Sequence, residues 1–226
     1  MSKIGKQLIN ENIQVEISGK KFISGFVIDF GSDTMVLYNG KDYVYIPIVH
    51  IQHIRKNEAD ENDIARPKEP ASFVEDNDKD EVSLRKVLTE AKGMYVEIFV
   101  MGSKPLHGYI TSIMNNYFVF HSPIYKTMYI TLYHLKWLTP YSQGQTPYDL
   151  KKNNFPNQPA NLQLARTFLV QIERFKDKLA VFNIGENDNY IGKINKVEGS
   201  FIEIQLARSR QPVYINMQHI KTLHLV

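Results

Sequence analysis

A ten-residue pattern occurs three times in this chain of 226 residues, and it constrains the fold more than any other feature. It reads Tyr, hydrophobic, x, hydrophobic, x, His, hydrophobic, x, x, hydrophobic, and its copies begin at Tyr45, Tyr129 and Tyr214. The histidines of the copies lie 84 and 85 residues apart and are His50, His134 and His219. Self-similarity at a fixed spacing is typical of repeated structural units. The pattern therefore predicts three copies of one small unit.

Further signals recur ahead of each copy of the pattern. A glycine stands 20, 21 and 22 residues before the tyrosine, at Gly25, Gly108 and Gly192. Short runs that alternate or are wholly apolar surround it, at 13–17, 95–99 and 179–182 before the glycine and at 35–38, 117–120 and 201–204 after it. Alternation over four to eight residues predicts half-buried strands. Glycine within a strand favours a sharp bend, because a Cβ there would crowd the neighbouring backbone.

A helix is predicted before the first strand of each unit. The clearest lies at 162–172, where apolar residues follow a helical period after a potential Asn161 cap, and Ser83 precedes a similar run at 84–88. The segment 4–9 is the shorter counterpart in the first unit. Each unit thus reads as a helix followed by about five antiparallel strands. Because so short a sheet must protect its edges, we expect a mainly β fold of three strongly bent, closed small barrels.

Two linkers separate the predicted units. We expect repeats at 1–56, 83–138 and 161–226, an acidic linker at 57–82, and a linker rich in Pro, Asn and Gln at 139–160. Residues 57–83 hold ten acidic and three basic side chains, which leaves 24 basic and 14 acidic ones elsewhere. The acidic linker is either a solvated spacer or a tethered segment that competes for a basic surface.

Several classes of protein are disfavoured by what the sequence lacks. Cysteine is absent, which excludes disulfides and thiolate metal sites. The sequence has no long apolar run and no leader-like start, so it predicts neither a membrane span nor a signal peptide. Phosphate-binding glycine loops and the serine nucleophile motif are missing, and paired acids such as Asp60–Glu61 lie in the polar linker. We expect no enzyme, no cofactor and no metal.

The repeated histidines are the strongest candidates for a site. One interpretation is structural: in the turn before the last strand, the ring satisfies backbone groups where strand pairing breaks and packs on the repeated tyrosine. Metal binding would need three units to share one ion, because each unit supplies only one such ligand. We interpret the glycine, tyrosine and histidine signature as structural.

Nucleic-acid binding is the alternative function. The units are basic once the acidic linker is set aside, Arg208 and Arg210 flank an expected loop, and tyrosines and phenylalanines are plentiful. However, most of these aromatic residues fall on strand positions that a small barrel needs for its core.

Two family resemblances follow from these residues. A helix and five bent strands, with the segment 32–38 resembling the first Sm motif, are similar to the Sm-like fold, whose rings commonly bind RNA. The second Sm motif has no counterpart, and the Lys-His pair of the bacterial branch would fall on Ile48 and Val49. The RNA contacts therefore do not carry over.

Over nearly the whole chain, three such units with an acidic first linker resemble the N-terminal region of the spore coat protein B family of Bacillus. That family carries a long Ser/Lys-rich tail, which is lacking here. The resemblance implies a non-enzymatic structural protein of the spore coat, made in the mother-cell cytoplasm, which binds other coat proteins and itself. It leaves open a pseudo-trimer, a six-unit ring formed by dimerisation, and a cytoplasmic location.

Overall fold

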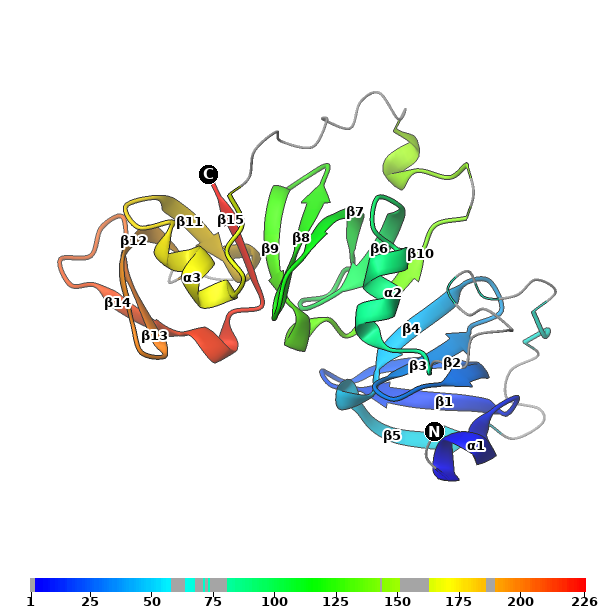
Figure 1. Ribbon diagram of the computed structural model, residues 1–226. Coiled ribbons are helices and arrows are strands. Elements are labelled where there is room, and N and C mark those ends of the chain that lie inside the picture. The colour runs from blue at the N-terminus through cyan, green and yellow to red at the C-terminus, as the bar shows by residue number, and fades with distance from the viewer. Residues whose placement is uncertain are drawn as a thin grey trace. The chain divides into compact units, whose positions relative to one another are not determined.

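The computed structural model describes residues 3–57, 64–67, 71, 73, 81–142, 144–150, 163–185 and 190–226. The chain divides into two compact units, and Figure 1 labels their helices and strands. The first comprises Met1–Phe99 and Lys136–Gly144, and the second comprises Val100–Leu135 and Gln145–Val226. The predicted second repeat therefore contributes strands to both units.

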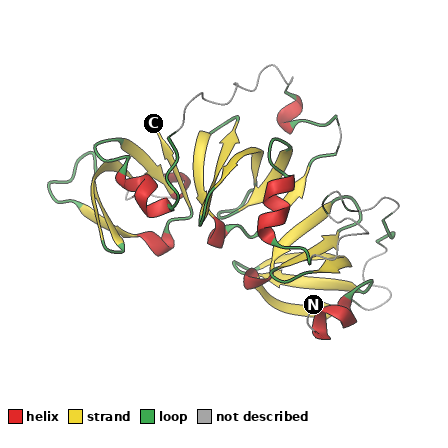
Figure 2. Ribbon diagram, viewed as in Figure 1, coloured by secondary structure: helices red, strands yellow, loops and turns green. Residues whose placement is uncertain are grey.

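The fold is mainly β with a few short helices, as predicted (Figure 2). The described residues contain fifteen strands, which pair antiparallel with their neighbours within each unit. No helix in this part of the chain is both long and apolar enough to span a membrane.

The first unit contains seven strands in the order β6-β10-β4-β3-β2-β1-β5. Their bounds are β1 Asn12–Ile17, β2 Lys21–Phe30, β3 Thr34–Tyr38, β4 Tyr43–Pro47, β5 Ile51–Lys56, β6 Tyr95–Phe99 and β10 Trp137–Pro140. Two helices, α1 (Lys3–Leu8) and α2 (Leu84–Glu90), accompany them. The core is formed by apolar side chains of β1 to β4, among them Ile13, Val15, Leu37 and Ile46.

The second unit contains eight strands in the order β14-β13-β12-β11-β15-β9-β8-β7. Their bounds are β7 Leu106–Ile113, β8 Tyr117–Ser122, β9 Lys126–Thr131, β11 Leu179–Phe182, β12 Ile191–Glu198, β13 Phe201–Gln205, β14 Val213–Asn216 and β15 Thr222–Leu225. The helix α3 (Phe168–Glu173) packs on the core through Phe168 and Ile172. Its short helical turns include η3 (Pro147–Asp149) and η5 (Asn183–Gly185).

The repeated glycines lie where a second strand closely approaches a third. A Cβ on Gly25 would overlap the carbonyl oxygen of Tyr38, and a Cβ on Gly108 would overlap that of His121. At Gly192 it would lie 2.8 Å from Gln205 O. Three residues after each glycine the pairing with the third strand shifts by a bulge, which increases the local bend.

Two of the three helices begin close to where the sequence places them. Ser83 caps α2, because its Oγ accepts the Lys86 N–H over 3.4 Å. The segment 4–9 is helical as α1. For the third helix, Asn161 and Leu162 lie outside the described residues, and the helix itself begins only at Phe168.

The prediction of three closed barrels requires a correction, because the sheet is open. The fourth strand of the first repeat, β4, pairs with β10 of the second repeat and not with its own β5. Likewise β9 of the second repeat pairs with β15 of the third. The edges of the short sheets are thus covered by the next repeat, which removes the need for each sheet to close on itself.

Candidate assembly interface

Successive repeats meet through the same strand pairing at two places. In the first unit β4 pairs with β10, where Tyr45 lies opposite Leu138. In the second unit β9 pairs with β15, where Tyr129 lies opposite Leu223. In both places the first residue of the repeated pattern faces the last residue of the pattern in the next repeat. We call this arrangement, with the contacts described next, the joint.

A side-chain cap to the next helix also recurs at each joint. The Leu84 N–H, at the first position of α2, donates to Asp33 Oδ1 over 2.7 Å. The Phe168 N–H, at the first position of α3, donates to Asn116 Oδ1 over 2.9 Å. The first N–H groups of a helix have no partner within the helix, so an oxygen supplied by the preceding repeat satisfies one of them.

A backbone hydrogen bond completes this contact. The Ser32 N–H donates to Val82 O over 3.2 Å, and the Asn115 N–H donates to Arg166 O over 3.0 Å. Each donor directly precedes the capping residue, and each acceptor lies two residues before the helix. Both joints therefore hold the incoming helix at the same two points.

Tyr45 is fully buried at the first joint. Its ring lies 5.2 Å from the Phe73 ring, and its hydroxyl accepts the Phe73 N–H over 3.2 Å. Burial raises the pKa of the Tyr45 hydroxyl above its usual range. The tyrosine therefore remains neutral at physiological pH and acts as a packing group with one satisfied polar atom.

The second joint buries two tyrosines. Tyr129 packs edge-on against Phe175, with ring centres 5.0 Å apart. Tyr117 Oη lies 2.7 Å from Ala165 O and 3.0 Å from Gln171 Oε1, so its proton is shared with groups at the start of the third repeat. Burial, with a smaller effect of the neighbouring Tyr129, raises the pKa of Tyr117 to about 12.

The third copy of the pattern has different surroundings. Tyr214 on β14 is 59% exposed, whereas Tyr45 and Tyr129 are buried. Among the described residues β14 pairs with β13 alone. The exposure of Tyr214 follows from the open edge beside it.

The repeated histidines end equivalent short helical turns, η1 (Ile48–His50), η2 (Leu132–His134) and η7 (Met217–His219). Their surroundings differ. His50 is buried, with Nδ1 3.2 Å from Ser18 Oγ, and His134 Nε2 lies 2.9 Å from the backbone oxygen of Gln218 in the next repeat. His219 is exposed. The three rings therefore differ in burial and in partners, and no cluster of three potential metal ligands occurs among the described residues.

The residues of the nucleic-acid alternative lie together in one connection. Arg208 and Arg210 are both exposed in the segment between β13 and β14. Neither arginine is among the residues that form the two joints.

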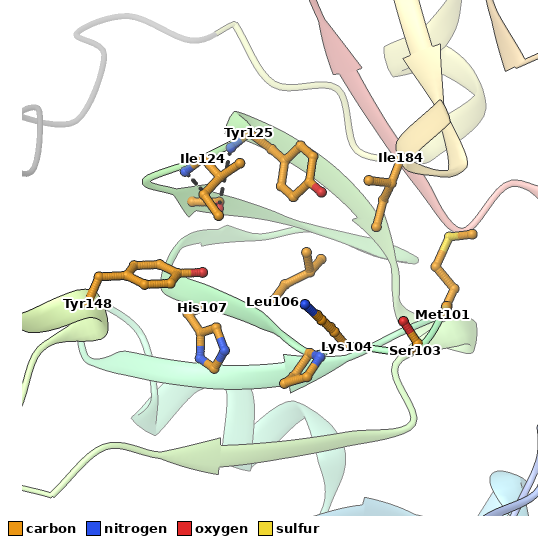
Figure 3. Close-up of a pocket in the computed structure, with 12 residues that line it drawn as sticks. Met101, Ser103, Lys104, Leu106, His107, Ile124, Tyr125, Tyr148 and Ile184 are labelled. Carbon is orange, nitrogen blue, oxygen red and sulfur yellow. Dashed lines mark hydrogen bonds between the residues drawn. The ribbon is translucent and has the colours of Figure 1, made fainter. Parts of the chain in front are cut away.

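The second unit also contains a pocket of about 310 Å³, which the sequence does not indicate (Figure 3). Tyr148 and Tyr125 project into it from different segments, and His107 packs edge-on against Tyr148 with ring centres 5.6 Å apart. Ser122 Oγ accepts the N–H groups of Ile124 and Tyr125. The described lining contains one ammonium group, Lys104, and no carboxylate. The pocket suits an apolar or aromatic group.

Comparison with known proteins identifies the relatives of this chain. The family model described as the YwrJ third domain matches residues 167–223, which hold α3, the strands β11 to β14 and the start of β15. The uncharacterized protein YwrJ of Bacillus subtilis (strain 168) is 35% identical over 223 residues, which are 97% of this chain and 97% of that protein. With its three tandem repeats and their two joints, the chain belongs to the YwrJ family.

Proposed function

We propose that this protein is a non-enzymatic assembly module, built from three Sm-like repeats, that acts as a structural component of the bacterial spore coat. One observation carries the assembly function: the chain builds the same edge-to-edge joint twice and leaves an exposed edge at β14. Exposed strand edges pair readily with other chains. The coat location is supported by the resemblance of the three units to the spore coat protein B family.

The proposal is tested by locating the protein in sporulating cells. A fluorescent fusion expressed from its own promoter should appear late in sporulation and form a shell around the forespore. A matched fusion carrying Tyr133→Asp, at an exposed position in η2, should behave in the same way. Diffuse fluorescence in vegetative cells, with no forespore shell, would contradict the coat function.

Nucleic-acid binding is the second candidate, and the exposed pair Arg208 and Arg210 favours it. Contacts with phosphates release counterions, so such binding weakens steeply as salt rises. We propose to measure binding of oligo-uridine and of mixed-sequence duplex over a salt series, with Arg208→Ala/Arg210→Ala as the comparison. The assembly proposal expects no binding even at low salt. Salt-sensitive binding that the double variant loses would support the alternative.

A further inference from the structure

Two strands at opposite ends of the strand order lack a neighbour on one side. Among the described residues, β14 pairs only with β13 and β5 pairs only with β1. These strands are the fourth strand of the last repeat and the fifth strand of the first repeat. The internal joints connect the same two kinds of strand. The two open edges are therefore the two halves of one joint.

The residues that face each other within a joint are less buried at the open edges. Tyr45 and Leu138 are both buried, as are Tyr129 and Leu223. The corresponding residue on β14 is Tyr214, which is exposed, and that on β5 is Ile54, which is only partly buried.

A second pair of positions shows the same contrast. Tyr117 on β8 and Gln171 on α3 are buried where they contact each other in the second joint. The equivalent of Tyr117 on β13 is Phe201, because both lie opposite the residue two places after the repeated tyrosine. The equivalent of Gln171 on α1 is Ile4. Gln171 lies 11 residues before Phe182, which pairs with Leu223 at the end of the third pattern. Ile4 lies 11 residues before Val15, which pairs with Ile54 at the end of the first pattern. Phe201 is 47% exposed and Ile4 is 65% exposed.

We infer that β14 of one molecule pairs with β5 of a second molecule of this chain, so that molecules associate head to tail through a third copy of the joint. The inference rests on the proposed assembly function and names its partner. Apolar side chains stand on both halves, Tyr214 and Phe201 on one and Ile54 and Ile4 on the other. A second copy buries all four, as the internal joints bury their equivalents.

The internal joints also indicate the register in which β14 of one molecule pairs with β5 of the other. In the second joint Leu223 lies opposite Tyr129, and Thr222 lies opposite Ile130. Transferred to the open edges, this places Ile54 of one molecule opposite Tyr214 of the other, and His53 opposite Ile215. A shift by one residue would turn the buried set of side chains to the opposite face.

The association is tested with the purified full chain by sedimentation velocity over a range of concentrations. The unaltered chain is expected to form species of two or more chains. Tyr214→Asp should reduce it to monomers, because a carboxylate would be buried at the joint without a partner. The matched control is Tyr133→Asp, since Tyr133 is 66% exposed and lies in η2, which belongs to neither edge strand. Monomers of the unaltered chain at all concentrations would overturn the inference.

Mixing two defective variants tests the head-to-tail direction. Ile4→Asp damages the β5 half of the joint and Tyr214→Asp damages the β14 half, so each variant alone should be monomeric. In an equimolar mixture one intact half of each kind remains, and dimers containing one chain of each variant should appear. If β14 paired with β14, Ile4→Asp alone would stay associated and mixing would restore nothing, which would refute the inference.

Cysteine cross-linking tests the register and the partner, and the chain contains no cysteine to interfere. Differently tagged Ile54→Cys and Tyr214→Cys chains, mixed and mildly oxidised, should give a disulfide-linked species carrying both tags. Ile54→Cys mixed with Tyr133→Cys is the control and should not. In the double variant Ile54→Cys/Tyr214→Cys, a dilute solution yielding only internally linked monomers would show closure within one chain and overturn the inference.

These outcomes are separate from those of the proposed function. A monomeric chain that still forms a shell around the forespore would refute self-association and leave the coat function standing. Head-to-tail association of the pure protein, with diffuse fluorescence in cells, would support the joint and remove the coat function.

Discussion

Asp33 accepts the backbone N–H of Leu84 over 2.7 Å, across 51 residues of sequence. This hydrogen bond attaches the helix of the second repeat to the sheet of the first. We predict that Asp33→Ala lowers the free energy of unfolding by about 0.5–2 kcal/mol, the usual cost of losing an N-terminal helix cap. Asp33→Asn should recover most of it, because Asn116 makes the equivalent contact with an amide oxygen. Urea unfolding of the three proteins measures this; equal losses for both variants would contradict the capping role.

The contrast between Tyr45 and Tyr214 predicts unequal effects of the same substitution. Tyr45→Ala should lower the free energy of unfolding by about 3–5 kcal/mol, because it leaves a cavity at a fully buried aromatic position. Tyr214→Ala, at an exposed site, should change it by about 0.5 kcal/mol or less in dilute solution. Denaturant unfolding at low protein concentration distinguishes the two, and similar losses would show that the edge of β14 is covered within the chain.

The repeated glycines should not tolerate alanine equally. Gly25→Ala and Gly108→Ala place a methyl group onto a carbonyl oxygen of the third strand, whereas Gly192→Ala leaves 2.8 Å. Overpacking of this kind usually lowers the free energy of unfolding by about 1–3 kcal/mol. We predict a loss near the upper end of that range at the first two positions and a smaller loss at the third. Melting temperatures of the three variants should follow this order. A Gly192→Ala protein less stable than Gly25→Ala would contradict the geometry.

The sequence predicted individual elements better than the connections between repeats. Alternation and the repeated pattern were sufficient to place the strands and the histidine turns, since these depend on residues close together in the chain. The pairing of β4 with β10 was not predicted, because the same hydrophobic strand can close its own sheet or extend a neighbour. The capping role of Asp33 and Asn116 was also missed. A signal existed, because a polar residue, Asp33, Asn116 or Ser200, stands before the third strand in every repeat, but its partner lies some 50 residues away.

The three histidines are predicted to differ in their effects on stability, although they occupy equivalent positions. His50→Ala removes a buried ring whose Nδ1 contacts Ser18 Oγ, and should cost about 1–3 kcal/mol. His134→Ala loses the contact with Gln218 O at a partly exposed site and should cost less. His219→Ala, at an exposed site, should leave the melting temperature nearly unchanged. Thermal unfolding measures the series, and three equal shifts would refute this order.

The burial of His121 and His224 predicts that the second unit loses stability in mild acid. Both rings lie in apolar surroundings, and burial lowers the pKa of each below its usual value of 6.5. Neither His121 ring nitrogen has a hydrogen-bond partner among the described residues. When the folded pKa lies below the unfolded one, the unfolded chain binds more protons, so stability is fully present above pH 6.5 and falls as the pH drops below it.

The free energy of unfolding, measured by urea titration between pH 8 and pH 5, should therefore decrease below about pH 6.5. His121→Leu should reduce this decrease, whereas the control His219→Ala, which removes an exposed ring, should not; a pH dependence identical in all three proteins would contradict the assignment.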